Sequence, residues 1–219
     1  TETVNPPDDS VGLSQMASGT DGNLITFDSS GNPSYVATAS DGMVLTSAGA
    51  GQPCAFEALP AGITLGTAVA TTSGNAIDIT SIPSGVKSIY LMFTSVSVSG
   101  SADPILVQIG DSGGIETSGY LGTGSLPTPT GNAMANHTNG FGIFNNNPPI
   151  AYNGWIGLKL LEASSNTWAA SGVLGFDAGG AYMIKTAGSK PLSGELDRIR
   201  LQAGGSDTFD LGKINIQYE

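Results

Sequence analysis

The sequence predicts an all-β protein in which an extended N-terminal arm and a short repeat stem precede an antiparallel β-sandwich with jelly-roll-like topology. Three observations support this class. The 219 residues include 32 Gly and 12 Pro, and only 11% are charged, against roughly 25% in an ordinary soluble domain. A 20-residue motif occurs twice near the N-terminus, and apolar residues alternate with polar ones over most of the remaining chain. Because Gly weakens helix interiors, helical classes are disfavoured.

Residues 1–17 are expected to form an extended anchoring arm. The segment is polar, and its adjacent prolines favour an extended path over helix or sheet. An arm of this kind becomes ordered by lying along a partner, and its acidic residues suggest a basic or amide-rich groove there. The expected anchoring residues are Thr1, Val4, Pro6, Pro7, Asp8 and Asp9.

Residues 18–60 contain the repeat and are expected to form a trimeric stem. Asp21-Gly22 returns as Asp41-Gly42, and each copy has the pattern of a turn, a short strand, a Gly-rich turn and a second short strand. Two such units cannot enclose a core, so the same segment of other copies is the simplest partner. The alternative is a flexible linker, which has no reason to keep apolar residues in register. The expected stem contacts are Leu24, Ile25, Phe27, Val44, Leu45 and Phe56.

Residues 61–219 are expected to form the β-sandwich head, from eight to ten strands. Apolar residues alternate with polar ones in several segments, and the apolar positions change parity after residue 93, which predicts a bulge near residues 94–95. One stretch, residues 121–152, has no such alternation and is rich in Asn, so we expect a long irregular loop there. The expected strands are 67–71, 76–80, 87–93, 96–98, 105–109, 156–160, 168–176, 181–186, 198–202 and 213–218.

Charge and composition exclude several classes of partner. Acidic residues outnumber basic ones 18 to 7, giving a net charge of −11, and nucleic acids are bound chiefly through Lys and Arg. The longest apolar run, residues 89–93, is far shorter than the roughly 20 residues of a membrane span. The first residues lack the basic and apolar regions of a secretory signal, so we expect synthesis in the cytoplasm. We therefore expect neither nucleic-acid binding nor membrane insertion.

The sequence contains no recognisable catalytic motif, and we expect neither enzymatic activity nor a cofactor. A glycan-cleaving enzyme needs a pair of carboxylates, and Asp111 and Glu116 are the candidates, with Asp103 nearby. Acidic residues beside glycines are more often turn formers, although a bound hard cation is an alternative. One cysteine, Cys54, and one histidine, His137, cannot form a disulfide or a zinc cluster within one chain. No metal site is therefore expected.

Aromatic residues gather around the Asn-rich stretch and suggest a glycan-binding site. An aromatic ring with neighbouring amides is suited to holding a sugar, whereas the alternative is that these rings belong to the core or to a subunit contact. The candidate glycan-binding residues are Tyr120, Asn136, His137, Phe141, Asn146, Tyr152 and Trp155.

Several segments resemble parts of virion-surface proteins of tailed bacteriophages. Residues 22–33 and 41–53 are similar to the stem repeat of tail-fibre and head-fibre proteins, and residues 82–87, 107–120 and 207–216 resemble domains of such proteins. The resemblance implies a trimeric fibre, spike or decoration protein on the virion surface, anchored through its N-terminus to a major capsid or tail protein. It implies no catalytic residues.

The expected function is therefore a non-enzymatic virion structural protein whose head binds host-surface polysaccharide. A stem of about 40 residues reaches at most about 130 Å, which favours a head fibre or capsid decoration. The alternatives are a tail-fibre protein that binds the host receptor and a glycan depolymerase.

Overall fold

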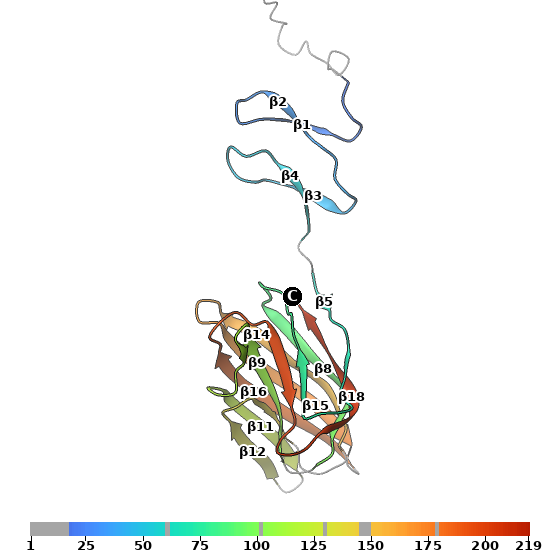
Figure 1. Cartoon of the computed structure of the whole chain (residues 1–219), viewed down its shortest axis with the longest axis vertical. Coiled ribbons are helices and arrows are strands. Elements are labelled where there is room, and N and C mark those ends of the chain that lie inside the picture. Colours follow the sequence, from blue (N-terminus) through green and yellow to red (C-terminus); the bar gives the residue numbers. More distant parts are fainter. Residues whose placement is uncertain (1–17, 60–61, 101–102, 129–130, 145–149, 178–179) are drawn as a thin grey trace, which may run out of the picture. The chain divides into compact units, whose positions relative to one another are not determined.

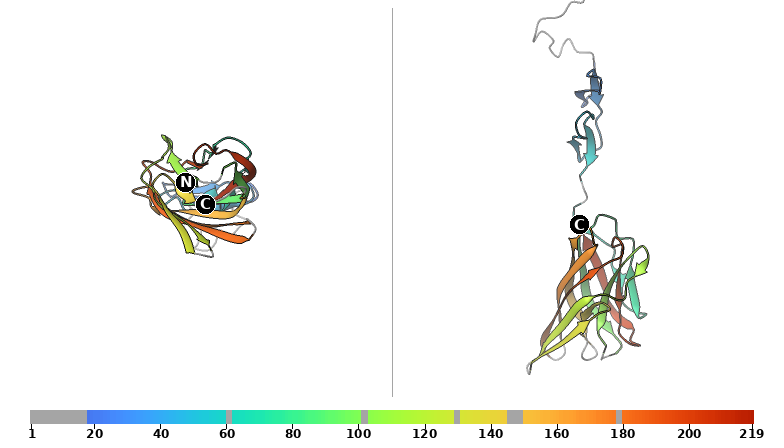
Figure 2. Two further views of the ribbon diagram at one scale, coloured as in Figure 1. Left: turned by 90° about the horizontal axis from the view of Figure 1, so that it is seen from below. Right: turned by 90° about the vertical axis from the view of Figure 1, so that its left-hand side faces the viewer.

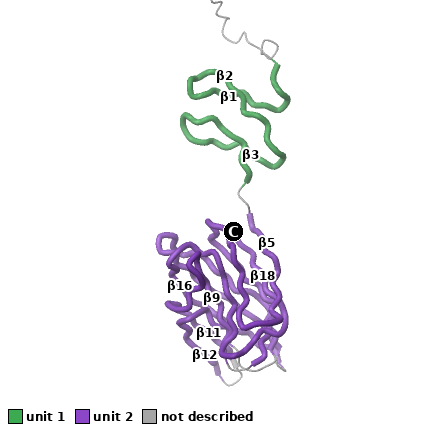
Figure 3. The backbone as a smooth tube through the Cα atoms, viewed as in Figure 1, with its two compact units in different colours: residues 1–60 green, residues 61–219 purple. Residues whose placement is uncertain are grey.

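The computed structural model describes most of the chain and is built of β-strands. The described residues are 18–59, 62–100, 103–128, 131–144, 150–177 and 180–219. Within these ranges no helix occurs, and hence none that is long and apolar enough to cross a membrane. The predicted all-β, sandwich-like class is confirmed. The chain divides into two compact units, residues 1–60 and 61–219 (Figure 3), which are described separately.

The first unit contains two antiparallel hairpins, each made of two four-residue strands (Figure 1). The strands are β1 (Leu24–Phe27), β2 (Pro33–Val36), β3 (Met43–Thr46) and β4 (Ala55–Ala58); β1 pairs with β2, and β3 pairs with β4. In the first turn the Asp28 carboxylate accepts hydrogen bonds from the backbone N–H groups of Ser30 and Asn32, at 2.8 and 2.9 Å. Gly31 lies between them with φ of 79°, a conformation that favours glycine.

The two hairpins differ in register by one residue. Ile25 lies opposite Tyr35 in the first hairpin, and Leu45 lies opposite Phe56 in the second. In the 20-residue repeat, however, Tyr35 corresponds to Ala55. The second hairpin has a longer turn, and this accompanies the shift in register. As a result, an aromatic residue lies opposite an aliphatic residue in both hairpins.

The second unit consists of two antiparallel sheets. The larger has the order β12-β11-β16-β15-β14-β8-β18, with β5 and β6 both paired to β18; the smaller has the order β10-β9-β17-β7, with β13 also paired to β9. The larger sheet contains β5 (Thr64–Leu65), β6 (Val69–Ala70), β8 (Ser88–Val98), β11 (Leu121–Thr128), β12 (Gly131–His137), β14 (Tyr152–Glu162), β15 (Thr167–Asp177), β16 (Ala181–Pro191) and β18 (Phe209–Tyr218). The smaller contains β7 (Ala76–Ile79), β9 (Ile105–Asp111), β10 (Gly114–Ile115), β13 (Phe141–Ile143) and β17 (Arg198–Gln202).

The chain passes repeatedly between these sheets, as a jelly-roll-like sandwich requires. β8 is followed by β9 in the other sheet, and β16, β17 and β18 again alternate between the sheets. The meander β14-β15-β16 stays within the larger sheet, which curls around the smaller one (Figure 2). Apolar side chains from both sheets fill the space between them, and the largest fully buried ones include Trp168, Tyr120, Tyr152, Phe141 and Phe209.

The predicted bulge near residues 94–95 is confirmed. Ser95 has φ of 52°, and the register between β14 and β8 shifts next to it. Side chains 89, 91 and 93 are buried before the bulge, and 96 and 98 are buried after it. The extra residue therefore changes which positions of the strand face the core, from odd-numbered residues before the bulge to even-numbered residues after it.

The prediction of a long irregular loop at residues 121–152 is wrong. This stretch contains β11, β12 and β13, with β11 paired to both β12 and β16. Glycines replace apolar side chains at the contact between strands: a Cβ on Gly122 would lie 2.7 Å from the Gly140 carbonyl oxygen, and one on Gly124 would lie 2.8 Å from that of Gly142. Because backbone packs on backbone here, the sequence lacks the alternation that identifies a half-buried strand.

Candidate functional site

The stem hairpins expose most of the apolar residues predicted to be trimer contacts. Phe27 is 64% exposed, and Leu24, Ile25, Val44 and Leu45 are also exposed. Phe56 is half-buried, as is Cys54, whose Sγ lies 3.9 Å from Thr26 Oγ1 on the first hairpin. Each hairpin is thus a two-stranded ribbon with little burial of its own, a structure that is marginally stable in water.

The residues predicted to anchor the arm, within residues 1–17, lie outside the described residues. The same applies to Asn146 among the predicted glycan-binding residues.

Three of the predicted glycan-binding aromatics lie in the core, which corrects the expectation that their rings contact a sugar. Tyr120, Phe141 and Tyr152 are each at most 1% exposed. Tyr120 and Phe141 pack edge to face at 5.1 Å, and the Tyr152 hydroxyl donates a hydrogen bond to the Phe144 carbonyl at 2.9 Å. Phe144 itself packs against the core. Their rings fill the space between the sheets, because the stretch around them folds into strands rather than a loop.

The predicted polar members are also separated. Asn136 is exposed and receives a 3.3 Å hydrogen bond from the Thr123 hydroxyl across β11 and β12. The next residue, His137, points into the protein and is buried, and burial lowers its pKa. A Cβ on Gly142 would lie 2.1 Å from the His137 ring, so the imidazole occupies space that a glycine leaves open.

Trp155 is the one predicted aromatic that lies on the surface, where it is 51% exposed. It projects from the outer face of the larger sheet beside Tyr90, and the two rings meet edge to face at 5.1 Å. Lys159 lies on the same strand, with Nζ 4.9 Å from the centre of the Tyr90 ring. These residues and Ser171 line a hollow of about 400 Å³. Of the four predicted aromatic residues, Trp155 alone therefore has a ring exposed at the surface.

Sequence reasoning missed Tyr90, Lys159 and Ser171. Successive side chains of a strand point to opposite faces, so a strand that places Ile89 and Leu91 in the core places Tyr90 on the outer face. The position of Tyr90 could therefore be predicted from the sequence. No sequence signal, however, indicated that β8 and β14 are neighbours and bring Tyr90 opposite Gly157.

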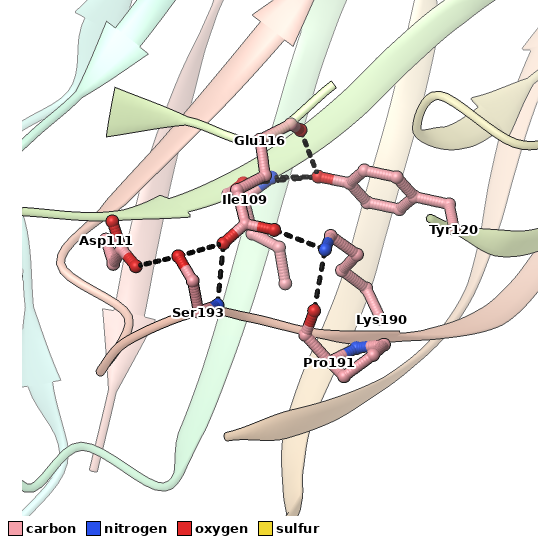
Figure 4. A network of polar contacts seen from close by, with 7 residues as sticks. All are labelled: Ile109, Asp111, Glu116, Tyr120, Lys190, Pro191 and Ser193. Atoms are coloured by element: carbon pink, nitrogen blue, oxygen red, sulfur yellow. Dashed lines mark hydrogen bonds and ion pairs between the residues drawn. The ribbon is translucent and has the colours of Figure 1, made fainter. Parts of the chain in front are cut away.

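The candidate catalytic carboxylates, Asp111 and Glu116, belong to a polar network between the β9–β10 hairpin and the chain after β16 (Figure 4). The Ser193 hydroxyl lies 2.7 Å from Asp111 Oδ2 and 2.8 Å from Glu116 Oε1, and the Ser193 N–H donates to Glu116 Oε1 at 2.7 Å. The buried Lys190 ammonium forms an ion pair with Glu116 Oε2 and donates to the Pro191 carbonyl at 2.6 Å. Tyr120 donates from its hydroxyl to the Glu116 carbonyl at 2.9 Å.

This network lowers the pKa of both carboxyl groups. Hydrogen bonds from Ser193 and from the Gly113 N–H lower the pKa of Asp111. Partial burial acts to raise the pKa of Glu116, but the hydrogen bonds from Lys190 and Ser193 outweigh it. Both groups are thereby held as carboxylates that fasten two loops together. Among the described residues, no group of three or more His, Cys, Asp or Glu is arranged to hold a metal ion.

Comparisons of the chain with protein-family models, with curated proteins and with solved structures found no match.

Proposed function

We propose that this chain is a non-enzymatic structural protein of a tailed-bacteriophage virion surface, a small head fibre, spike or capsid decoration protein. It associates as a homotrimer through residues 18–60 and displays the β-sandwich, which binds host-surface glycan. The observation that supports this most directly is the exposure of the apolar residues of both stem hairpins.

Self-association follows from the energetics of those hairpins. Apolar surface contributes about 25 cal/mol per Å² when it is removed from water, and Phe27, Ile25 and Leu45 keep about half or more of theirs exposed. A second copy of the same hairpin offers a matching surface around a symmetry axis. The resemblance to phage stem repeats is the basis for proposing a trimer, and the exposed apolar residues are the reason that the copies associate.

The mass of the full-length protein in solution tests this proposal. We expect three times the 22.0 kDa chain mass, measured by light scattering coupled to gel filtration. The double variant Ile25→Asp, Leu45→Asp should dissociate to monomers, because it places charge in the contact. Leu161→Asp is the matched control, since Leu161 is exposed on the head, and it should leave the mass unchanged. A monomeric parent protein would refute the proposal.

The arm is proposed to anchor the trimer to a major capsid or tail protein. Deleting residues 1–17 should leave a trimer that no longer associates with particles, as counted by quantitative immunoblotting of purified virions. Particles that incorporate the truncated chain at parental occupancy would place the anchor elsewhere.

A tail-fibre receptor-binding protein is the second candidate, and the exposed Trp155 beside Tyr90 favours it. Labelling the protein on virions with an antibody distinguishes capsid from tail. A depolymerase has no comparable support, because Asp111 and Glu116 both accept hydrogen bonds from Ser193 and so hold the β9–β10 hairpin to the chain after β16. Host capsule or lipopolysaccharide incubated with the protein should keep its chain length, whereas cleavage abolished by Asp111→Asn would identify an enzyme.

A further inference from the structure

We propose that the outer face of the larger sheet binds an acidic polysaccharide in a shallow trough that crosses β11, β16, β15, β14 and β8. The inference names the ligand class for the glycan-binding role and so rests on the proposed function. The floor of the trough consists of Thr123, Ala187, Ser171, Gly157 and Tyr90, one residue from each strand.

Strand register brings the five floor residues into one row. Each is the direct cross-strand partner of the next: Thr123 of Ala187, Ala187 of Ser171, Ser171 of Gly157, and Gly157 of Tyr90. Directly opposed residues point to the same face of a sheet. With strands spaced about 4.8 Å apart, the row is about 19 Å long, so it suits an extended ligand rather than a single small molecule. The three middle residues are Ala, Ser and Gly, so no large side chain projects from the middle of the floor.

Larger side chains stand on either side of this floor. Trp155, Val173 and Lys185 form one flanking row, since Val173 is the cross-strand partner of both Trp155 and Lys185. On the other side Lys159 is opposite Ala169. Hollows of about 400 and 260 Å³ lie along the row and share residues 171–173 in their linings. They are therefore adjoining parts of one trough.

Gly157 makes room for the two aromatic rings at one end of the trough. A Cβ at this position would lie 3.2 Å from Trp155 Cζ3 and 3.5 Å from Tyr90 Cε1. The two rings meet at an interplanar angle of 75°, and Trp155 is half exposed. Two rings set at a steep angle around a glycine leave a corner in which the C–H face of a sugar ring can lie against the indole, while hydroxyl groups reach Ser171 and Thr123.

The charge of the trough is opposite to that of the whole protein. The linings of the two hollows contain Lys159 and Lys185 and no Asp or Glu, although acidic residues outnumber basic ones 18 to 7 in the chain. An acidic ligand is repelled by the general negative surface and attracted here, which restricts where it can bind. Carboxylates spaced along a polysaccharide can reach both lysines while its rings lie on the floor.

Full-length protein titrated with polygalacturonate, alginate and hyaluronate by calorimetry tests the inference, with dextran as the neutral polymer. We expect at least one acidic polymer to bind and dextran to bind at least tenfold more weakly. Trp155 emission should change on binding. The second tryptophan, Trp168, is buried at 2% exposure and should stay silent.

Variants locate the binding. Trp155→Ala should weaken acidic polymers at least tenfold, and Lys159→Gln with Lys185→Gln should remove the preference for acidic over neutral polymer and reduce the salt dependence. Leu161→Ala and Lys213→Gln, exposed residues outside the linings, should stay within twofold of the parent.

Three results overturn the inference: no binding of any acidic polymer, tighter binding of single-stranded DNA through the same lysines, or a change in oligomeric mass with Trp155→Ala, which would make this face a contact between copies. The mass measurement separates this inference from the proposed function. A trimer that binds no polymer refutes the trough alone, whereas a monomer that binds polymer refutes the trimeric stem alone.

Discussion

The two units of the chain use the same kind of strand in opposite ways. In the head, the inner strands of the larger sheet have neighbours on both edges and a second sheet against one face, so residues such as Leu91 and Ile156 are fully buried. In the stem, each strand has one partner and no facing sheet, and Ile25 and Leu45 remain exposed. The difference indicates that apolar alternation specifies a buried face only when the chain supplies a second layer to cover it.

The largest expected effect is the contrast between a core and a stem substitution. Trp168→Ala removes a fully buried ring and should reduce the free energy of unfolding of the head by about 3–5 kcal/mol. Phe27→Ala should leave that quantity within about 0.5 kcal/mol, because Phe27 belongs to the other unit, and should weaken trimer association instead. Urea denaturation and light scattering measure the two quantities. Equal effects of both substitutions on head stability would contradict the comparison.

A second test concerns the close packing of β11 against β16. A Cβ on Gly188 would lie 2.4 Å from the Leu121 carbonyl oxygen and 2.8 Å from Gly122 Cα. Backbone cannot move aside as a flexible side chain can, so Gly188→Ala should destabilise the head by about 1–3 kcal/mol. Gly175→Ala is the control, because its Cβ would meet nothing closer than 3.9 Å. Thermal unfolding of both variants measures the difference, and an unaffected Gly188 variant would mean that the two strands are less closely packed.

The carboxylate network should make the head sensitive to acid. The pKa values of Asp111 and Glu116 are lowered in the folded state, so the folded protein binds fewer protons than the unfolded chain. Their contribution is present above the unfolded pKa values, about 4, and is lost as the pH falls below them. Glu116→Gln should cost about 1–2 kcal/mol at pH 7, because it leaves the buried Lys190 ammonium without its carboxylate.

Urea denaturation of the parent and Glu116→Gln between pH 3 and 7 measures this effect. The difference in stability between the two proteins should be largest at pH 7 and should shrink toward pH 3. A difference that is independent of pH would mean that the lost packing, not the charge, causes the change.

The smallest expected effect concerns His137, whose pKa burial lowers below its usual value near 6.5. In the window between the folded and unfolded pKa values the unfolded chain binds more protons, so stability rises with pH there and is complete above about pH 6.5. We therefore expect the free energy of unfolding to rise slightly between pH 5 and 7. His137→Gln should abolish this slope whatever its effect on absolute stability, and chemical denaturation at several pH values measures it. An unchanged slope would assign the titration to another group.

The class of the fold, the two repeat hairpins and the bulge could be predicted from the sequence. Each of these depends on short-range patterns: the spacing of Asp-Gly turns, the period-two alternation along residues 213–218, and the change of parity that places Val96 in the core. Side-chain direction in a strand follows from the backbone itself, so these features can be inferred without knowing what any strand contacts.

The neighbours of each strand, and with them the candidate site, could not be predicted from the sequence. The close glycine contacts of β11 depend on backbone from other segments of the chain, as does the burial of Tyr120. The surroundings of Trp155 also depend on contacts between distant segments, because the pairing of β8 with β14 places Tyr90 opposite Gly157. These contacts join residues far apart in the sequence, and a local pattern does not encode the register between two distant strands.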